Sequence, residues 1–313
     1  MKKNILITGG AGNVGGSLAR RLVADPNNHV VIVDNLLTGS RKKLPNASTG
    51  NWRFIKADCN RMDEMFPIMC STNFDYVFHY AAVVGVSRTL DSPRMVLDDI
   101  KGIENILGLA KSTGVKRVFY SSSSEVYGEP VEFPQRESTT PLNSRLPYAI
   151  VKNLGEAYFK SYYQEYGLEY TIFRFFNTYG PLQSTDFVMS KFMSQAIAGE
   201  PLTVYGNGSQ TRTYCYVDDN LDTVEKILND GLAINEVINV GSDVETPTIE
   251  LAERIIKITG SSSRISFLPP LKEGDMTRRL PDISRMRSIL GRELTLLDNG
   301  IRLTQGFIEH RVV

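Results

Sequence analysis

The sequence predicts an α/β protein with a doubly wound parallel sheet and a smaller, interleaved C-terminal domain. In the first 176 residues, short segments rich in β-branched and aromatic residues alternate with longer amphipathic segments. The centres of the short segments are continuously apolar, which is typical of strands that helices cover on both faces. Together, the alternation and the apolar centres indicate parallel strands connected by helices.

Six segments of the first half are expected to be strands. They are residues 4–8, 29–34, 52–58, 74–80, 116–120 and 170–176. Helices are expected between them, and one is marked by apolar residues that recur at intervals of three and four along a single helical face. These residues are Val96, Ile100, Ile103, Leu107 and Ala110.

The second half of the chain is less regular and has more turns that contain glycine and proline. We expect a first domain over residues 1–176 and a second domain over residues 177–313. The apolar segment 236–241 reads as a strand that returns to the first sheet. The boundary is therefore predicted to be interleaved, with a return to the first domain near residues 213–241.

The composition excludes several classes of partner. Lys plus Arg and Asp plus Glu are 35 each, so the formal net charge is zero and a nucleic acid or an anionic membrane is not expected as a partner. The three cysteines lie far apart without metal-ligand spacing, which favours a reducing compartment. We find neither a run of transmembrane length nor a signal peptide, so we expect a cytoplasmic protein.

A glycine-rich turn follows the first expected strand and opens a helix. Gly9, Gly12 and Gly15 are spaced G-x-x-G-x-x-G. Such a turn lets backbone N–H groups and a helix N-terminus approach a pyrophosphate. Because the turn stands between a strand and a helix, we interpret it as the dinucleotide site of a Rossmann-type domain, with Asn13 and Val14 included in the binding loop.

Asp34 ends the second expected strand, where its carboxylate would accept hydrogen bonds from the adenosine ribose hydroxyls. A carboxylate there repels a 2′-phosphate, and the following Asn35 and Leu36 supply no arginine to bind one. NAD is therefore predicted as the cofactor, with Asn35 among its contacts. Asp58, at the end of the third strand, either reaches the adenine edge or caps the strand end.

Tyr148 and Lys152 are one helical turn apart, on a helix that Pro147 helps to begin. Of the fourteen tyrosines, only Tyr148 has a lysine four residues later. Chance gives about one such pair, so a surface pair remains an alternative. In a nicotinamide-binding fold, however, a nearby ammonium would stabilise the phenolate of a tyrosine whose ordinary pKa is about 10. The pair is thus a candidate general base.

The stretch "SSSSEVYGEP", residues 121–130, places four serines and a glutamate at the end of the fifth strand. One interpretation is a solvated loop, because serine is a poor strand former. The other is an active site, because cofactors bind outside the carboxyl ends of parallel strands. In that case a serine hydroxyl could bind the same substrate oxygen as Tyr148.

Taken together, these motifs resemble the extended short-chain dehydrogenase/reductase superfamily, in its nucleotide-sugar epimerase/dehydratase branch. The resemblance covers nearly the whole chain. It rests on "TGGAGNVGG", "DNLLTGSRKKL", "HYAA", "SSSSEVYG", "YAIVK", "FRFFNTYGP" and "TVYGNGSQTRTYCYVDD". It implies a catalytic set of Ser123, Tyr148 and Lys152, and a nucleotide-sugar diphosphate bound by Asn177 and Arg212.

The same resemblance implies a shared first step, in which Tyr148 takes a proton from a sugar hydroxyl and hydride passes to NAD. It also implies that Ala81, within "HYAA", contacts the cofactor. A homodimer is expected, built on the helix that carries Tyr148 and the helix that spans residues 96–110.

The branches of this group differ around the serine cluster. Ser124-Glu125, with Arg145 and Arg279, resembles UDP-glucuronate decarboxylases, in which Glu125 and Arg279 would act on the carbon 5 substituent. The segment "AVVGVSRTLDSP" resembles 4-epimerases instead, and "YAIVK" departs from the "YDEGK" of the decarboxylases. A 4,6-dehydratase, a catalytically silent NAD-binding scaffold, and a purely structural Glu125 with Arg279 on a diphosphate remain alternatives.

Overall fold

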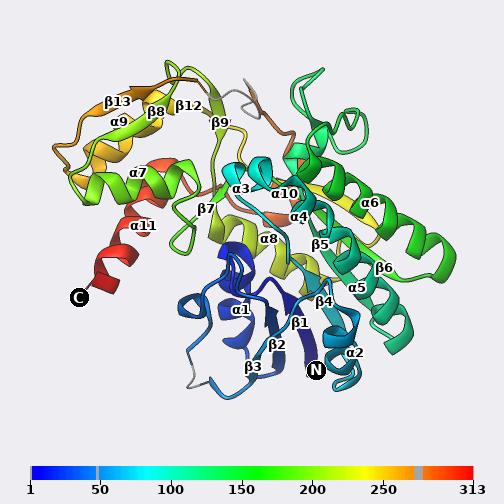
Figure 1. Ribbon diagram of the computed structural model, residues 1–313. Coiled ribbons are helices and arrows are strands. Elements are labelled where there is room, and N and C mark those ends of the chain that lie inside the picture. The colour runs from blue at the N-terminus through cyan, green and yellow to red at the C-terminus, as the bar shows by residue number, and fades with distance from the viewer. Residues whose placement is uncertain (1, 47–48, 271–277, 313) are drawn as a thin grey trace.

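The computed structural model describes residues 2–46, 49–270 and 278–312 and has a seven-stranded parallel sheet at its centre (Figure 1). Its strand order is β11-β6-β5-β4-β1-β2-β3. The strands are β1 Lys3–Thr8, β2 Asn28–Asp34, β3 Trp52–Lys56, β4 Tyr76–His79, β5 Arg117–Ser123, β6 Glu169–Phe175 and β11 Glu236–Val240. All six predicted strands of the first half are present, and the order reverses direction between β1 and β4, as a doubly wound sheet requires.

Helices cover both faces of this sheet. One layer consists of α1 (Asn13–Val23), α8 (Val217–Asp230) and α10 (Ser284–Leu290), and the other of α2 (Met62–Cys70), α5 (Asp99–Thr113) and α6 (Pro147–Tyr166). Successive strand residues alternate between the layers: Ile5 and Ile7 are packed with α1, whereas Leu6 is packed with α5. The predicted fold class is therefore confirmed.

Two predicted elements differ most from the structure, whereas the bounds of the other predicted strands differ by one or two residues. β5 continues through Ser121, Ser122 and Ser123, because these serines pair with β6 and the Ser122 hydroxyl donates to the buried Glu156 carboxylate at 2.6 Å. The predicted single helix over residues 96–110 is two helices, α4 (Pro93–Leu97) and α5, which are separated at Asp98. The apolar face survives the break, since the side chains predicted to be apolar on it still contact the same core.

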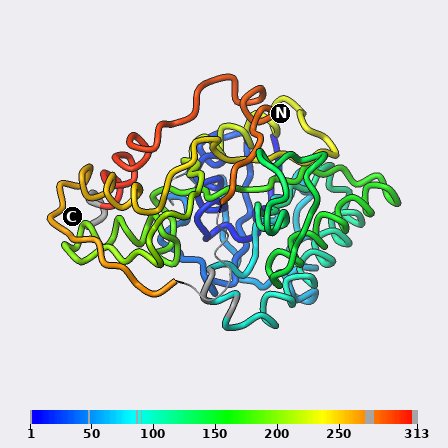
Figure 2. Tube along the Cα trace, turned by 90° about the horizontal axis from the view of Figure 1, so that it is seen from above, coloured from blue at the N-terminus to red at the C-terminus, as the bar shows by residue number. Residues whose placement is uncertain are grey.

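A second lobe stands beyond one end of the main sheet (Figure 1). It contains α7 (Val188–Ile197), α9 (Thr248–Thr259), α11 (Leu297–Val312), a parallel pair of strands and an antiparallel pair. The parallel pair is β8 (Leu202–Tyr205) with β13 (Ile265–Leu268), and the antiparallel pair is β9 (Thr211–Thr213) with β12 (Glu245–Pro247). Figure 2 shows α7 and α9 beside each other at this end of the molecule.

The chain passes between the two lobes more than once. β7 (Thr178–Tyr179) pairs with β10 (Cys215–Tyr216), and the chain then continues through α8 into β11, which lies beside β6 in the main sheet. This is the return that the segment 236–241 predicted. The division at residue 177 and the return near residues 213–241 remain predictions about domains.

Short elements complete the described chain: the 3-10 helices η1 (Arg41–Lys43) and η3 (Ser124–Tyr127), and the helix α3 (Val86–Asp91). Among the described residues, we find no helix that combines the length and apolarity needed to cross a membrane.

A buried ion pair connects α6 to the sheet behind the serine cluster. Arg174 on β6 and Glu156 on α6 have side chains only 2% and 1% exposed, and two guanidinium nitrogens donate to the two carboxylate oxygens at 2.9 and 2.7 Å. Arg174 also donates to the Tyr127 hydroxyl at 2.8 Å, which donates in turn to Asn239 on β11. The network therefore joins α6, η3 and the two neighbouring strands β6 and β11.

We expect Arg174→Met to lower the free energy of unfolding by about 3–5 kcal/mol, because it leaves the Glu156 carboxylate buried without its main cationic partner. Urea denaturation measures this. Lys160→Met is the matched control: the exposed Lys160 lies 3.8 Å from the same carboxylate and should contribute less than about 1 kcal/mol. Equal losses in both variants would contradict a dominant role for Arg174.

Candidate active site

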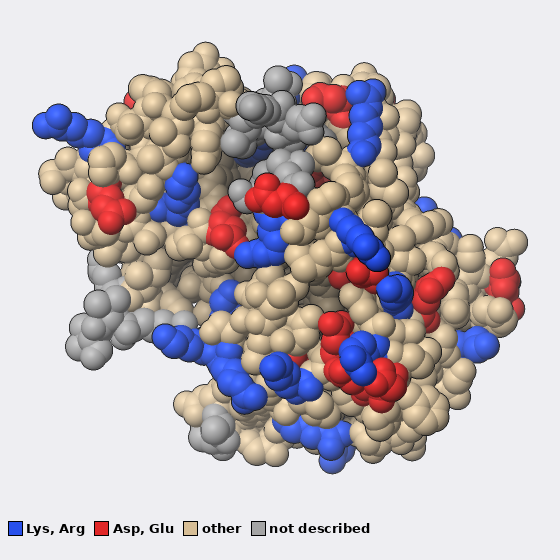
Figure 3. Space-filling model, in the orientation of Figure 1, with Lys and Arg blue, Asp and Glu red and all other residues tan. Residues whose placement is uncertain are grey.

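A pocket of about 770 Å³ opens at the carboxyl ends of the main strands and extends toward the second lobe. Residues that follow β1, β2, β3, β4 and β5 line it, together with the start of α6 and the loop before α7. On the right half of the face in Figure 3, acidic side chains lie beside basic ones rather than apart from them. The pocket lies where the strand order predicts a ligand.

The glycine turn brings the start of α1 to this pocket. Gly9 has φ +68°, and a Cβ there would lie 2.6 Å from the backbone nitrogen of Ala81. A Cβ at Gly15 would overlap the Gly9 carbonyl oxygen. Glycine at both positions therefore permits the close contact between the turn, the helix and β4.

The first turn of α1 suits an anionic group. Gly12, Asn13, Val14 and Gly15 all line the pocket, and this turn carries no acidic side chain. The first N–H groups of a helix have no intrahelical acceptor, and the helix dipole is positive at this end. The Asn13 side-chain oxygen is buried without a hydrogen-bond partner in the part of the chain that the structure describes.

Asp34 is held at the wall of the pocket by two backbone N–H groups. Its carboxylate accepts from Ala11 at 2.9 Å and from Leu36 at 2.8 Å. Asn35 donates to the Asp58 carboxylate at 3.2 Å, and that carboxylate also accepts from the Asn60 N–H at 2.9 Å. Asp58 thus both caps the turn after β3 and lines the pocket. The two roles predicted for it, contact with the adenine edge and capping of the strand end, therefore both remain open.

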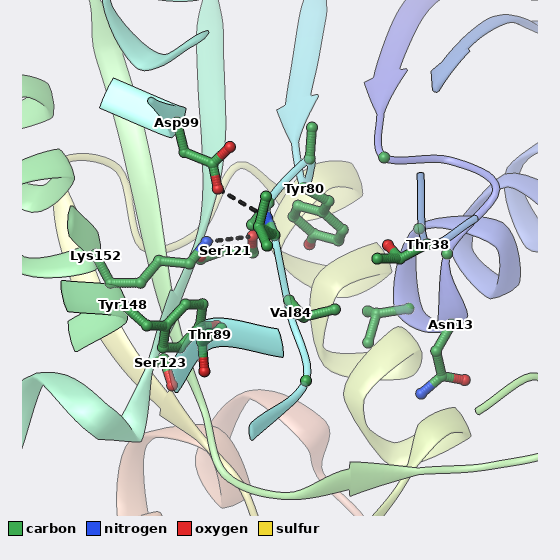
Figure 4. Close-up of a pocket in the computed structure, with 18 of the residues that line it drawn as sticks. Asn13, Thr38, Tyr80, Val84, Thr89, Asp99, Ser121, Ser123, Tyr148 and Lys152 are labelled. Atoms are coloured by element: carbon green, nitrogen blue, oxygen red, sulfur yellow. Dashed lines mark hydrogen bonds between the residues drawn. The ribbon is translucent and has the colours of Figure 1, made fainter. Parts of the chain in front are cut away.

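Ser123, Tyr148 and Lys152 lie together in the pocket (Figure 4). Ser123 ends β5, and its hydroxyl accepts from the Glu125 N–H at 3.2 Å. The Lys152 ammonium lies 5.7 Å from the centre of the Tyr148 ring and donates to the Ser121 carbonyl at 2.6 Å. The helical spacing of Tyr148 and Lys152 therefore directs both side chains inward rather than to solvent.

Burial shifts the pKa values of this set in opposite directions. Desolvation and the nearby Glu125 carboxylate raise the pKa of Tyr148, and the hydrogen bond with Ser123 offsets only part of the rise. Desolvation lowers the pKa of Lys152 to about 8, with Asp99 acting in the opposite direction. The predicted stabilisation of the Tyr148 phenolate is therefore not achieved by the chain alone, since burial outweighs it.

A second ion pair, between a buried arginine and a partly buried glutamate, lies beside the same serines. Arg279 is only 5% exposed. Its guanidinium lies 2.6 Å from one Glu125 oxygen and donates to the Ser124 hydroxyl at 3.1 Å. The other Glu125 oxygen is buried and accepts no hydrogen bond from any described residue. All three residues line the pocket.

Of three other predicted substrate contacts, one lines the pocket and two do not. Asn177, with φ 37°, lines the pocket, and its side-chain nitrogen is buried with no acceptor among the described residues. Arg212 is on β9, donates to the Thr211 carbonyl at 2.8 Å, and is not part of the pocket lining. Arg145 is exposed before α6 and is not part of it either. The pocket therefore brings in Asn177 but neither of these arginines.

The comparisons with known proteins agree with this geometry. A family model described as the NAD dependent epimerase/dehydratase family matches residues 5–241, which is most of the chain. The protein belongs to this family. It is therefore an NAD-dependent enzyme, and the predicted cofactor is confirmed.

Members of three branches of the family are similar to this chain. UDP-glucuronic acid decarboxylase 3 of Arabidopsis thaliana is 35% identical over 298 residues, which cover 92% of this chain and 84% of that protein. UDP-glucose 4-epimerase of Thermotoga maritima, solved with UDP-glucose, is 31% identical with a TM-score of 0.92 and covers 99% of this chain and 100% of its own. The dTDP-glucose 4,6-dehydratase DesIV of Streptomyces venezuelae, solved with NAD, is 26% identical with a TM-score of 0.90. The match covers 98% of this chain and 97% of that one.

The residues present fit NAD. The glycine turn, the anion-accepting start of α1 and the Asp34 carboxylate line one side of the pocket, and Ala81 lies against the turn. Ser121 and Lys152 line the side near Tyr148, where a nicotinamide ribose would be bound. When bound, NAD supplies hydride acceptance and return.

Sequence reasoning did not identify several members of this NAD-dependent site. His79 is buried, its Nδ1 lies 2.8 Å from the Thr8 hydroxyl, and burial lowers its pKa to about 3, so it is neutral. The Tyr80 hydroxyl is buried without a partner in the described chain. Both residues stand in "HYAA", which was a usable signal. Asp99, at the start of α5, had no local signal.

We expect Asp34→Ala to weaken NAD binding by about 10- to 100-fold, because hydrogen bonds to a charged group contribute about 1.5–3 kcal/mol. Titration calorimetry measures the affinity, and a melting curve shows whether the turn itself still folds. Asp25→Ala removes an exposed carboxylate from the loop before β2 and serves as the control. Wild-type protein that binds NADP as tightly as NAD would contradict the role given to Asp34.

Proposed function

We propose that this enzyme decarboxylates UDP-glucuronate through a 4-keto sugar intermediate. The observation that carries the proposal is the ion pair between the buried Arg279 and the partly buried Glu125, which lines the pocket beside Ser124 and next to Tyr148. Similar proteins named UDP-glucuronic acid decarboxylase, from plants and vertebrates, are 33–35% identical over most of this chain. A buried cation beside the reacting serines suits an acidic sugar better than a neutral one.

In the first step, the Tyr148 oxygen would accept the proton of the sugar's carbon 4 hydroxyl, and the hydrogen on carbon 4 would leave as hydride, for which bound NAD would be the acceptor. Ser123 would donate a hydrogen bond to the same sugar oxygen, and the Lys152 ammonium would hold a ribose hydroxyl of the cofactor. Because burial raises the pKa of Tyr148, the base depends on positive charge brought into the pocket. A bound nicotinamide cation would supply such a charge, so proton removal by Tyr148 would be coupled to cofactor binding.

In the second step, Arg279 binds the carbon 6 carboxylate. The sugar carboxylate would share or replace the contact that Glu125 makes with the guanidinium, and the Glu125 oxygen that has no partner would then be available to a sugar hydroxyl or water. A carboxylate β to the new ketone is lost readily as carbon dioxide. The enol that remains is protonated at carbon 5, and the Glu125 carboxylate, which lines the pocket beside Arg279, would relay that proton from water.

A 4-epimerase is the second candidate. The Thermotoga maritima UDP-glucose 4-epimerase matches this structure over its whole length, and the segment after Ala81 resembles such enzymes. In that case the 4-ketone would be reduced again from the other face. Glu125 would then cap the end of β5, and Arg279 would bind only phosphate.

Incubation with UDP-glucuronate, UDP-glucose and the corresponding dTDP- and GDP-sugars tests the proposal directly. Mass spectrometry then separates the branches by the loss of carbon dioxide, the loss of water, or no change in mass. Release of carbon dioxide from UDP-glucuronate is the expected result. Interconversion of neutral UDP-hexoses without it would make the enzyme a 4-epimerase.

The rest of the proposal concerns the second lobe and assembly. Residues 177–313 would bind the nucleotide sugar, with Asn177 and Arg212 on its diphosphate, although Arg212 would have to turn toward the pocket from β9. A homodimer would form on α6, whose Ile150 and Leu154 side chains are 42% and 38% exposed on one helical face. The exposed residues of α5 are polar, which leaves α6 as the main contact; light scattering tests this.

We expect Tyr148→Phe to lower kcat by about 10²- to 10⁴-fold, because the phenol oxygen that takes the proton is removed. Binding of NAD should change little, since the ring and Lys152 remain. Steady-state rates and calorimetry measure the two effects. The control is Tyr163→Phe, which removes the hydroxyl of an exposed tyrosine on the same helix. Substantial turnover by Tyr148→Phe would assign the base to another residue.

We expect Arg279→Ala to lower kcat/KM for UDP-glucuronate by about 10²- to 10³-fold, because the substrate carboxylate and Glu125 lose a buried cation. Carbon dioxide release measures the change. Arg278→Ala provides a matched control, since the neighbouring Arg278 is half exposed and pairs with Glu245 at 2.6 Å outside the pocket. If both variants keep wild-type rates, Arg279 does not bind the substrate carboxylate.

A further inference from the structure

Asp99 is a partly buried carboxylate in the pocket wall, at the first position of α5. One oxygen accepts from the Val83 N–H at 2.7 Å, and the other accepts from the Asn60 side chain at 3.5 Å. Both donors are neutral, and no described cation lies within ion-pair distance of Asp99. The structure thus holds a carboxylate in place without neutralising it there.

Lys152 is a cation whose hydrogen-bond partners among the described residues are likewise neutral. Its side chain is buried, and its ammonium donates to the Ser121 carbonyl and hydroxyl, which are also neutral. In Figure 4 the Asp99 carboxylate and the Lys152 ammonium converge from α5 and α6 on the same part of the pocket. Among the described residues, Asp99 supplies the negative charge that opposes the lowering of the Lys152 pKa by burial.

The other groups that face this cluster do not replace Asp99. Glu125 is already paired with Arg279, and Asp58 accepts from Asn35 and Asn60. From the sheet, His79 is neutral, and the Tyr120 ring lies 5.0 Å from the Lys152 nitrogen, with its hydroxyl un-ionised because burial raises its pKa. From α6 itself, the Tyr148 hydroxyl is un-ionised in the protein without its cofactor, because burial raises its pKa.

We propose that Asp99 is a positioning residue that keeps Lys152 charged across the pocket and orders the loop after β4 through the Val83 N–H. The proposal rests on the proposed function only in that Lys152 belongs to the reacting set. Neither the decarboxylase nor the epimerase alternative changes it, since both begin with the same oxidation.

The expected pH effect follows from the sign of the charge. The pKa of Lys152 lies near 8, and removing the Asp99 charge would lower it further, so more of the lysine would be neutral at pH 7–8. Asp99 also raises the pKa of Tyr148, so that pKa would fall as well. Both limbs of a bell-shaped rate profile would therefore move to lower pH together.

The direct test is carbon-13 NMR of protein labelled at lysine Cε, with the Lys152 resonance assigned by its loss in Lys152→Arg. We expect a midpoint near pH 8 in the wild type and a midpoint lower by about 1 unit in Asp99→Asn. This variant keeps an oxygen for the Val83 N–H but loses the charge. Asp99→Glu should restore the midpoint toward the wild-type value.

Three controls separate charge from structure and from reaction. Asp230→Asn removes an exposed carboxylate at the end of α8 and should leave the midpoint unchanged. Asp99→Ser is the second neutral variant, should a melting curve show that Asp99→Asn does not fold. An unshifted Lys152 midpoint in a folded neutral variant would overturn the proposal. Because the readout needs no turnover, failure of the proposed reaction would not affect it.

Discussion

The buried pairing of Glu156 with Arg174 is the constraint on which the active site depends. Glu156 stands one helical turn after Lys152, which stands one turn after Tyr148, so all three project from one side of α6. The same carboxylate accepts from Ser122, in the middle of the serine run. By fixing α6 against β5 and β6, the pair fixes the distance between the helix that carries the base and the strand end that carries Ser123.

The alternation of β5 explains how a serine run can serve two purposes. Successive side chains of a strand point to opposite faces. All three serines border the pocket, but the Ser122 hydroxyl points to Glu156 in the core, whereas the Ser121 and Ser123 hydroxyls point toward Lys152 and Tyr148. The low strand propensity of serine is offset here by hydrogen bonds to each hydroxyl and by backbone pairing of Ser121, Ser122 and Ser123 with β6.

Charge balance in the pocket is arranged across elements that are distant in the chain. Arg279 comes from the segment before α10 and contacts Glu125 in η3. Asp99 on α5 opposes the lowering of the pKa of Lys152, on α6, by burial. Arg279 is in contact with Glu125, as Lys101 is with Asp98 at the same wall, whereas Lys152 and Asp99 do not form a direct ion pair. This leaves Lys152 and Asp99 able to respond to a charged ligand, since neither is locked into a direct ion pair.

The sequence by itself determined the elements and the local sites. Apolar segments predicted all six strands of the first half because their burial on both faces leaves a continuous pattern, and the glycine turn, Asp34 and the pair Tyr148–Lys152 were readable because each is a contact or spacing within a few residues. The tertiary structure alone decided what meets across the pocket. Arg279 joins Glu125 over 154 residues, Asp99 faces Lys152, and Arg145 and Arg212 stand outside the pocket lining although their motifs suggested otherwise. Side-chain direction at a loop or strand edge depends on packing between distant segments, and no local pattern records that packing.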